Sequence, residues 1–318
     1  MKFYFAPMEG ITGYVYRNAY EAAFSGISKY FSPFIVPHQK RDFKQKELRD
    51  IFPENNSTLT LIPQILTNQA EDFLRTVRTF REIGYEEVNL NLGCPSGTVT
   101  AKGKGAGFLA EPEVLDGFLE TIYEKADVKI SIKTRIGIDT GEEFYRLLEI
   151  YQKYPLEELI VHPRCLKDYY KKPPDQEIFS WAAGHYNGKL IYNGDIFCKE
   201  DYQILTERNA HLDGVMLGRG LLRNPGLIQE ILEDVPATVE QIKNLHDHIL
   251  EGYIEMLSGD RNVLFRMKEL WFYMIEWFAI EGREKYAKQI KKAQTIAEYR
   301  SVVKSIFQQY PMHGNQML

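Results

Sequence analysis

Residues 86–112, EEVNLNLGCPSGTVTAKGKGAGFLAEP, combine a short apolar run with a loop of unusual composition. The run at 87–93 has the length and apolar content of a buried strand. It leads into a cysteine placed between Gly93 and Pro95, and the whole stretch holds five glycines and two lysines. A segment that only reversed the chain direction would not need this combination. We therefore expect a strand followed by a loop that carries function.

Similar runs of β-branched and aromatic residues recur along the chain, each followed by loop residues and then by a helical pattern. The eight runs lie at 3–7, 28–36, 59–66, 87–93, 128–134, 158–163, 189–195 and 213–219. Near-continuous apolar strands that alternate with helices are typical of a parallel sheet. Eight such units predict an α/β fold, the (β/α)8 TIM barrel, which needs about 250 residues.

The helical pattern is clear between the third and fourth runs. In 68–84, Phe73, Val77 and Phe80 fall on one helical face, and Gly84 provides a stop signal. This spacing predicts an amphipathic helix that packs its apolar face against the sheet.

After Pro236 only helical segments follow. Two pairs with capping-box spacing mark helix starts: Thr238 with Gln241, and Thr295 with Glu298. Apolar residues then recur at helical spacing, at Ile242, Leu245, Ile249, Tyr253 and Met256. The tail is therefore predicted to be a bundle of about four helices. We expect a TIM-barrel catalytic domain at 1–236 and an all-helical domain at 237–318.

The composition is that of a folded protein from a reducing compartment. Hydrophobic residues make up 44% of the chain and aromatic residues 13%, which supports a large core. Cys94, Cys165 and Cys198 are widely spaced and form no C-x-x-C pair, so both a disulfide framework and a metal site are disfavoured. The formal net charge of −5 means that a polyanion partner would need a local basic patch.

No targeting or membrane segment is indicated. The apolar start at 1–10 is shorter than the roughly 7 to 15 residues of a signal core. The longest apolar patch, at 270–280, is interrupted by Glu276 and falls short of the roughly 18 residues of a membrane span. We expect a cytoplasmic monomer without a membrane partner.

Polar side chains gather at the predicted carboxyl ends of the strands, where the active site of such a barrel lies. In chain order these are Pro7, Met8, Glu9, Gln64, Asn91, Cys94, Lys133, Arg135, His162, Asn193, Asp195, Gly218 and Arg219. Structural support alone does not require so many polar groups at one edge.

The last two strand ends, YNGDI and LGRGLLRNP, have the composition of a phosphate cradle. Gly194, Gly218 and Gly220 let the main chain approach an anion closely, and Arg219 adds a charged fork. The alternative is that these glycines only form tight turns.

Lys133 and Arg135 lie two residues apart in one strand, so both can point into the barrel mouth. A ring system that becomes anionic on reduction, as a flavin does, is stabilised by such a cation. The alternative is a fixed ion pair between Lys133 and a carboxylate such as Glu9 or Asp195. His162, on the next strand, is either a hydrogen-bonded structural histidine or part of the site.

These motifs together resemble the tRNA-dihydrouridine synthases, in the order of that family and over nearly the whole chain. They are APMEGIT, PQI at 63–65, NLNLGCP followed by KGKGAGFL, IKTRIG at 132–137, VHPR at 161–164, YNGDI and LGRGLLRNP. The tail, with RMKELWFYM at 266–274, is similar to the RNA-binding domain of the family.

The resemblance implies a barrel that binds FMN and uses NADPH to reduce the 5,6 double bond of selected uridines in tRNA. It places FMN at Pro7, Met8, Glu9, Gln64, Lys133, His162, Asn193, Gly194, Asp195, Gly218 and Arg219. It places the substrate at Asn91, Arg135, Lys102, Lys104 and Tyr170.

Cys94 has a role in this chemistry that its residue type explains. Reduction requires a hydride from reduced FMN at carbon 6 of the uracil and a proton at carbon 5, and an unperturbed thiol with a pKa of about 8.5 is a suitable proton donor. The glycine-containing loop after Cys94 is expected to close over the substrate, with Lys102 and Lys104 near phosphates. The alternative for Cys94 is a small buried filler.

Two segments depart from the family pattern: HPRC at 162–165 and DYYKKPPD at 168–175. They leave open the role of Arg164 and how that loop meets the substrate. Two other functions also stay open, an FMN barrel that acts on a free pyrimidine, like a dihydroorotate dehydrogenase, and a non-catalytic RNA-binding barrel. A free base needs no helical second domain, and a binding protein would not need Cys94, Lys133 and His162 together.

Overall fold

The computed structural model describes residues 1–37 and 43–309, which form two compact units. The first unit, the barrel unit, contains Met1–Pro7, Ile27–Asp195 and Tyr202–Leu217. The second, the helical unit, contains Met8–Gly26, Ile196–Asp201 and the chain from Gly218 onward. The predicted domain boundary at 236 remains a prediction.

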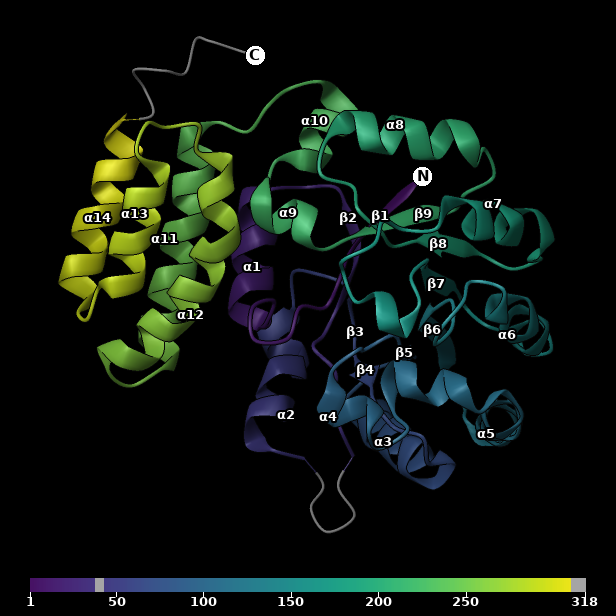
Figure 1. Cartoon of the computed structure of the whole chain (residues 1–318). Helices are drawn as coiled ribbons and strands as arrows, with labels where there is room; N and C mark the ends of the chain where they lie inside the picture. The colour runs from purple at the N-terminus through teal and green to yellow at the C-terminus, as the bar shows by residue number, and fades with distance from the viewer. Residues whose placement is uncertain (38–42, 310–318) are drawn as a thin grey trace. The chain divides into compact units, whose positions relative to one another are not determined.

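The barrel unit is built on one sheet of nine parallel strands in the order β3-β2-β1-β9-β8-β7-β6-β5-β4 (Figure 1). The strands are β1 (Lys2–Phe5), β2 (Ile27–Phe31), β3 (Leu61–Ile62), β4 (Gln64–Ile65), β5 (Glu87–Leu92), β6 (Lys129–Arg135), β7 (Leu159–His162), β8 (Leu190–Tyr192) and β9 (Gly214–Leu217). Each lies within or overlaps one of the eight predicted runs, so the predicted barrel is confirmed.

The ninth strand arises because one predicted run, 59–66, is split at Pro63. Proline has no N–H to donate to a ladder. β3 pairs with β2, and β4 pairs with β5, so this single segment joins the two ends of the sheet. The Pro63 carbonyl accepts from the Asn89 amide at 3.0 Å. The sheet is thereby closed into a barrel.

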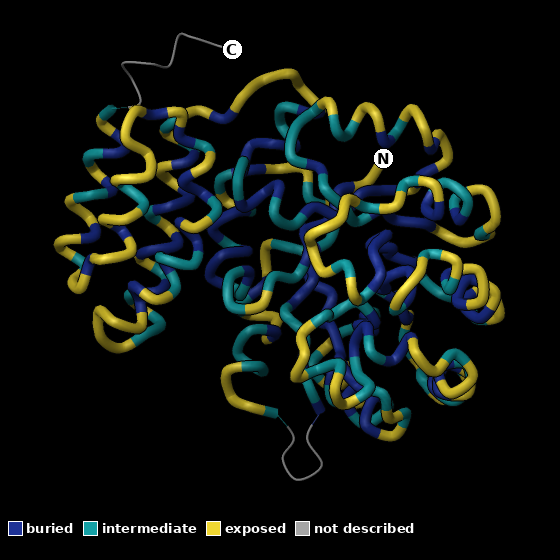
Figure 2. The backbone as a smooth tube through the Cα atoms, viewed as in Figure 1, coloured by how far each residue is buried: buried dark blue, intermediate teal, exposed yellow. Residues whose placement is uncertain are grey.

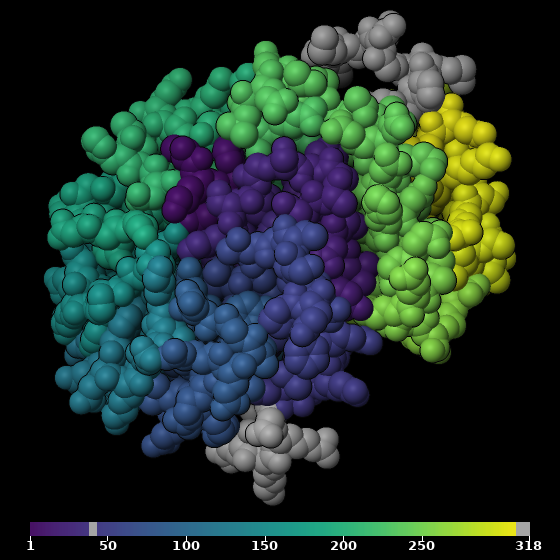
Figure 3. All heavy atoms as spheres, turned by 180° about the vertical axis from the view of Figure 1, so that it is seen from behind, coloured from purple at the N-terminus to yellow at the C-terminus, as the bar shows by residue number. Residues whose placement is uncertain are grey.

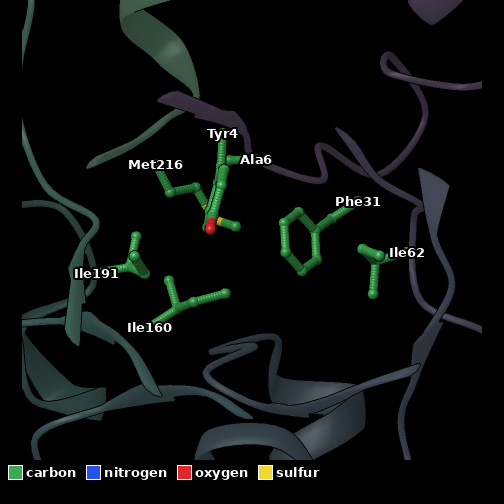
Figure 4. Close-up of a cluster of buried hydrophobic side chains, with 7 residues drawn as sticks. All are labelled: Tyr4, Ala6, Phe31, Ile62, Ile160, Ile191 and Met216. Atoms are coloured by element: carbon green, nitrogen blue, oxygen red, sulfur yellow. The ribbon is translucent and has the colours of Figure 1, made fainter. Parts of the chain in front are cut away.

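The strands are the most deeply buried part of the barrel unit (Figure 2). Seven side chains from six strands and their ends converge inside the barrel (Figure 4): Tyr4, Ala6, Phe31, Ile62, Ile160, Ile191 and Met216. Such a packed interior is the usual core of this fold.

Charged groups line the barrel near the start of its strands. Lys29 Nζ lies 2.7 Å from Glu87 and 3.2 Å from Glu158, and the hydroxyl of Tyr4 donates to Glu158. Burial raises the pKa of Glu87, and hydrogen bonding to Lys29 opposes this rise. Glu158 is fully buried, and its contacts with Lys29 and Tyr4 offset the free-energy cost of burying its carboxylate.

Helices of the barrel unit follow the strands. They are α2 (Gln45–Ile51), η1 (Pro53–Asn56), α3 (Ala70–Glu82), α4 (Gly97–Thr100), η2 (Gly105–Ala110), α5 (Pro112–Lys125), α6 (Glu143–Tyr151), η3 (Leu166–Asp168), α7 (Gln176–His185) and most of α8 (Lys199–Arg208). In α3, Phe73, Val77 and Phe80 are all buried, as the spacing predicts. Gly84 follows α3 with a φ of 103°, a conformation that favours glycine.

The helical unit contains α1 (Tyr14–Ala23), α9 (Arg219–Arg223), α10 (Leu227–Glu233), α11 (Val239–Met256), α12 (Asp260–Met274), η4 (Ile275–Trp277), α13 (Arg283–Lys292) and α14 (Ile296–Gln309). The tail thus has the four predicted α-helices among its described residues. Their core includes a polar chain, in which His246 Nε2 and Trp271 Nε1 approach the Tyr299 hydroxyl at 2.6 and 2.5 Å.

Helix α1 was not predicted to belong with the tail. It packs against α11, where a methyl group added at Gly252 would lie 2.7 Å from Val15. In the view from behind, the N-terminal segment lies beside the green C-terminal helices (Figure 3). The helix that follows the first strand therefore shares a core with residues more than 200 positions later.

One of the two capping boxes forms as predicted. Thr238 and Gln241 exchange both hydrogen bonds. Thr295 accepts from the Glu298 amide at 3.2 Å, but the Glu298 carboxylate takes the amide of Gln294 instead of the Thr295 amide. In the part of the chain that the structure describes, no helix has the length and apolar character needed to cross a bilayer.

Candidate functional site

A chain of hydrogen-bonded buried side chains, here called the amide chain, links β4, β5 and β6. Asn91 Nδ2 donates to Gln64 Oε1 at 2.7 Å, and Gln64 Nε2 donates to Asn89 Oδ1 at 2.7 Å. Asn89 then donates to the Ser131 hydroxyl at 2.9 Å. These hydrogen bonds satisfy side chains that are almost fully buried. The amide chain therefore holds Gln64 and Asn91 in fixed orientations.

Asn91 also shapes the turn that presents Cys94. Its Oδ1 accepts from the backbone amides of Gly93 at 3.0 Å and Cys94 at 2.9 Å. An amide oxygen has two lone pairs, and both are used here. Asn91 can therefore contact a substrate only as a donor, through its second side-chain N–H, because both lone pairs of its oxygen are already used.

The loop after Cys94 is folded tightly on that residue. Ala106 donates its amide to the Cys94 carbonyl at 3.0 Å. Gly105 has a φ of 57°, and a methyl group there would lie 2.8 Å from the same carbonyl. Gly107 approaches the backbone of Thr100 equally closely. These glycines allow the loop to pack closely on Cys94. Closure of the loop over a substrate, which the sequence predicts, stays a prediction.

The two lysines of this loop lie at its surface. Lys102 is exposed and Lys104 is half-buried. Asn68 Nδ2 donates to the carbonyls of Lys102 and Gly103 at 3.0 and 3.2 Å, which fixes the backbone that carries these lysines. Both ammonium groups are therefore presented from an anchored loop.

Arg135 joins two loops at the mouth of the barrel, the one after β5 and the one after β7. Its Nε donates to the Gly93 carbonyl at 3.0 Å, and its Nη1 donates to the Cys165 carbonyl at 2.8 Å. Both Nη atoms donate to the Tyr169 carbonyl at 3.1 Å. Burial lowers the pKa of Arg135, with a nearby arginine adding to this shift and the neighbouring Tyr170 opposing it. Most of its N–H groups thus serve the protein, so Arg135 mainly orders the loops around Cys94.

Lys133 is a cation in the barrel mouth without a carboxylate partner. Among residues 1–37 and 43–309, no Asp or Glu oxygen is paired with its Nζ within 4 Å. Desolvation lowers its pKa from 10.5 to about 7; Arg135 adds to the shift, and the Cys94 thiolate would oppose it. Lys133 pairs with Asn91 in the sheet register. An anionic group beside Lys133 would offset this desolvation, and Cys94 is close enough to interact with Lys133 electrostatically.

Arg164, whose role the sequence left open, is the centre of the next cluster. It forms a bidentate pair with Asp195, with distances of 3.1 Å at Nη1 and 2.5 Å at Nη2, and donates to the Lys172 carbonyl at 2.6 Å. Its Nη1 also lies 2.9 Å from His162 Nε2. Because a guanidinium only donates, His162 Nε2 accepts, and the neutral ring carries its proton on Nδ1. Asp195 is thus paired with Arg164, and the alternative of a Lys133–Asp195 ion pair is wrong.

Arg164 could have been found from the sequence by its spacing. It follows His162 by two residues at the end of a predicted strand, and such residues face the same side. The signal was weak because the partner, Asp195, is 31 positions away. Only the parallel arrangement of β7 and β8 brings their two loops together.

Tyr170 lies over two guanidinium groups. Its ring centroid is 5.4 Å from Arg135 and 5.8 Å from Arg164, and its ring is tilted toward His162 at 5.8 Å. Its side chain remains half exposed. The preceding Tyr169 has a φ of 49°, which is strained for a bulky residue. Tyr170 is therefore an accessible aromatic surface beside the predicted substrate residues.

The loop after β8 makes a close approach to its own strand. Asn193 Nδ2 donates to the Met216 carbonyl at 2.7 Å, which ties this loop to β9. A methyl group at Gly194 would lie 2.1 Å from the Tyr192 hydroxyl, so no other residue fits without movement. Gly194 is thus explained by packing, and Asn193 by a structural hydrogen bond.

In the helical unit, Gly218 and Arg219 begin α9. The Arg219 guanidinium lies 5.5 Å from the Phe197 ring, and the Arg223 guanidinium lies 4.6 Å from the same ring. A methyl group at Gly220 would lie 2.2 Å from the Ile196 carbonyl. The Phe197 ring thus contacts two guanidinium groups, of which Arg223 also pairs with Glu276 at 3.2 Å. The phosphate role of Arg219 stays a prediction.

Pro7 and Met8 follow β1, and Glu9 is exposed. Met8 donates its amide to the Thr12 hydroxyl at 2.7 Å, and its carbonyl accepts from the amides of Ile11 and Thr12 at 3.0 Å. The backbone of Met8 is consequently used within its own turn. A ligand would meet only its side chain.

Comparison with known families gives an extended match. The family model described as "Dihydrouridine synthase (Dus)" matches residues 4–309. A protein of Staphylococcus aureus named "Probable tRNA-dihydrouridine synthase" is 26% identical over 313 residues, covering 95% of this chain and 92% of that protein. A "tRNA-dihydrouridine(20/20a) synthase" of Vibrio parahaemolyticus is 26% identical over 217 residues, covering 64% of this chain and 66% of that protein.

Solved structures share the barrel. The old yellow enzyme homologue from Zymomonas mobilis superposes with a TM-score of 0.54 at 11% identity and covers 77% of this chain and 92% of that chain. The structure of TcOYE with pHBA gives a TM-score of 0.51 at 10% identity and covers 81% of this chain and 96% of that chain. At these identities the likeness concerns the fold.

Proposed function

This chain belongs to the dihydrouridine synthase family, and from that premise we propose that it reduces the 5,6 double bond of uridines in tRNA to dihydrouridine. We propose FMN as its bound cofactor and NADPH as its electron donor. The relatives named as tRNA-dihydrouridine synthases support the substrate.

The observation that carries this proposal is the desolvated Lys133 on β6, which Cys94 influences electrostatically. A desolvated lysine with no carboxylate partner in the described structure fits a group that becomes anionic on reduction. On the neighbouring strand β7 and the loops after β7 and β8, His162 and the paired Arg164 and Asp195 add polar atoms of fixed orientation. These residues of the barrel unit fit a flavin; the phosphate role of Arg219 is a proposal that rests on the sequence motif.

When bound, FMN supplies the hydride for carbon 6 of the uracil. Cys94 holds the proton for carbon 5, and the turn fixed by Asn91 and Arg135 orients its thiol. Lys133 stabilises the thiolate that remains after proton transfer, because a cation near a thiolate lowers its free energy. A positioned acid of this kind contributes typically about 10²- to 10⁴-fold to rate.

The substrate must be drawn out of folded tRNA before it can reach such a site. Tyr170, half exposed beside Arg135, offers a surface on which a base can stack. We propose that Lys102 and Lys104 contact phosphates from their anchored loop. We also propose that residues 237–318 form the tRNA-binding domain. The absence of disulfides at the three cysteines supports a cytoplasmic location.

The test is the substitution Cys94→Ala, compared with Cys198→Ala as a matched control. We expect the Cys94 variant to retain the flavin absorption spectrum and to lose at least about 100-fold in dihydrouridine formation on unmodified tRNA, whereas the control keeps wild-type activity. Mass spectrometry of the digested tRNA measures the product. Wild-type turnover by Cys94→Ala would remove the acid role.

The substrate class is tested in parallel with free uracil and orotate. We expect NADPH consumption that depends on tRNA and is not supported by the free bases. Turnover of orotate or uracil without tRNA would favour the free-pyrimidine alternative. A purified protein without flavin that also fails to take up added FMN would favour the non-catalytic one.

A further inference from the structure

Residues 8–12, here called the post-β1 loop, have their carbonyl groups bound by the helical unit to which they belong. The Met8 carbonyl is satisfied inside the loop by the amides of Ile11 and Thr12. The carbonyls of Gly10, Ile11 and Thr12 are each bound by a side chain from a different helix. Side chains of α1, α11 and α12 therefore fix the backbone of this loop.

The strongest of these contacts comes from Arg266 in α12. Its Nη1 donates to the Gly10 carbonyl at 2.6 Å and lies 3.2 Å from the carboxylate of Glu269, one turn later. Gly10 has a φ of 84°, and a methyl group there would lie 3.2 Å from Arg266 Nη1. The backbone at Gly10 is thus shaped so that the guanidinium can reach its carbonyl.

Two further side chains complete the arrangement. Arg17 of α1, which is almost fully buried, donates to the Thr12 carbonyl at 2.8 Å. Tyr253 of α11 donates to the Ile11 carbonyl at 3.4 Å. Hydrogen bonds from charged donors are the stronger ones, so Arg17 and Arg266 dominate. Arg17 lies in α1 and Arg266 in α12, so the loop is bound by one early helix and one late helix of the chain.

We propose that Arg266 is a positioning residue for flavin binding, which acts through the Met8 side chain of its own unit. This inference rests on the proposed function, which assigns Pro7 and Met8 to the flavin. Because the Met8 backbone is closed inside the loop, the position of its side chain depends on where the loop is anchored. Arg266 sets that anchor at Gly10.

The proposal gives the motif RMKELWFYM, residues 266–274, a role in flavin binding in addition to the RNA binding that the resemblance implies. Its first residue points to the post-β1 loop and its partner Glu269 orients it. A motif that served only RNA would affect tRNA affinity and leave the flavin unchanged. The two roles therefore predict different measurements.

The experiment titrates flavin-depleted protein with FMN and follows flavin fluorescence and absorption in Arg266→Ala, Arg266→Lys and Glu269→Gln. We expect Arg266→Ala to weaken FMN binding about tenfold or more, as loss of a charged hydrogen bond implies, and to shift the flavin absorption bands. Arg266→Lys keeps one cationic donor and should recover part of the affinity. Arg261→Ala, an exposed arginine of the same helix, is the matched control and should bind FMN like the wild type.

Two outcomes would overturn the inference. Arg266→Ala with wild-type FMN affinity and spectrum would show that the loop needs no anchor from α12. Equal losses in Arg266→Ala and Arg266→Lys, with a matching fall in melting temperature, would show a structural role only. Failure of the wild-type protein to bind FMN would instead contradict the proposed function, so the two failures can be told apart.

Discussion

At the scale of single residues, Lys133 shows how burial and function oppose each other. Burial lowers the pKa of Lys133 to about 7, so its charged form destabilises the folded protein. Arg135, two residues later, is fully buried, and backbone carbonyls accept most of its hydrogen bonds. The two cations therefore differ: Arg135 orders loops through its hydrogen bonds, and Lys133 is the one proposed to bind a ligand.

Lys133 leads to a prediction for the pH dependence of stability in the flavin-free protein. Its folded pKa, about 7, lies below the ordinary value of 10.5. Between these values the unfolded chain binds more protons, so the free energy of unfolding due to this group rises with pH. Below about pH 7 both states are protonated and the full penalty remains.

Urea unfolding of wild type and Lys133→Met at several pH values measures this effect. We expect the variant to be more stable at pH 6 and to lose the rise between pH 7 and 10.5. Lys129→Met, at an exposed position of the same strand, is the control. Parallel pH profiles for wild type and Lys133→Met would contradict the assignment.

At the scale of elements, the Arg164–Asp195 pair links the end of β7 to the loop after β8. Its geometry is bidentate, and the arginine is almost completely buried whereas the aspartate is partly exposed. Removing one partner of such a pair leaves an uncompensated charge. The pair thus ties together two loops that the flavin is proposed to contact.

A double-mutant cycle measures this link. We expect Arg164→Met and Asp195→Asn each to lower the free energy of unfolding, and the double variant to lose less than the sum, by about 0.5 to 3 kcal/mol. Lys167→Met with Asp139→Asn, an exposed pair, provides the control and should be nearly additive. Additivity at Arg164 and Asp195 would mean that their contact is not coupled in solution.

The elements were predictable where their signal is local. Apolar runs such as 87–93 gave all the strands, and the spacing of Phe73, Val77 and Phe80 gave α3. The place of Arg164 beside His162 could be read from their two-residue spacing, but its partner Asp195 could not be predicted, because a neighbouring strand supplies it. The same holds for Arg135, whose carbonyl acceptors come from loops whose shape depends on the closed barrel.

At the scale of the whole molecule, the two compact units do not follow the order of the chain. Helix α1 and the post-β1 loop belong with the tail, although they come directly after the first strand. Sequence patterns suggested a boundary at 236 because the alternation of strands and helices ends there. Which earlier helix shares the core of the tail is a matter of tertiary packing, which no local pattern records.

The proposed RNA contact of the tail gives a prediction at this scale. Lys285, Lys288 and Lys292 are exposed on one face of α13, and within the described structure none is paired with a carboxylate. Charge reversal at all three should weaken tRNA binding and lower the slope of log affinity against log salt by about 2 to 3. Filter binding at several salt concentrations measures both.

Reversal of Lys125, an exposed lysine at the end of α5, is the control for this experiment. It should leave the salt slope unchanged. Unaltered affinity and slope in the triple variant would exclude α13 from the RNA-binding surface.

The split of the run 59–66 at Pro63 determines how an insertion at this point would affect the site. Gln64 reaches the amide chain only because it stands one position after the proline that divides the two short strands. An extra residue inserted between them would turn Gln64 outward, since neighbouring strand positions face opposite sides. Closure of the sheet at Pro63 and the hydrogen bonds of Gln64 in the amide chain therefore depend on a spacing of one residue.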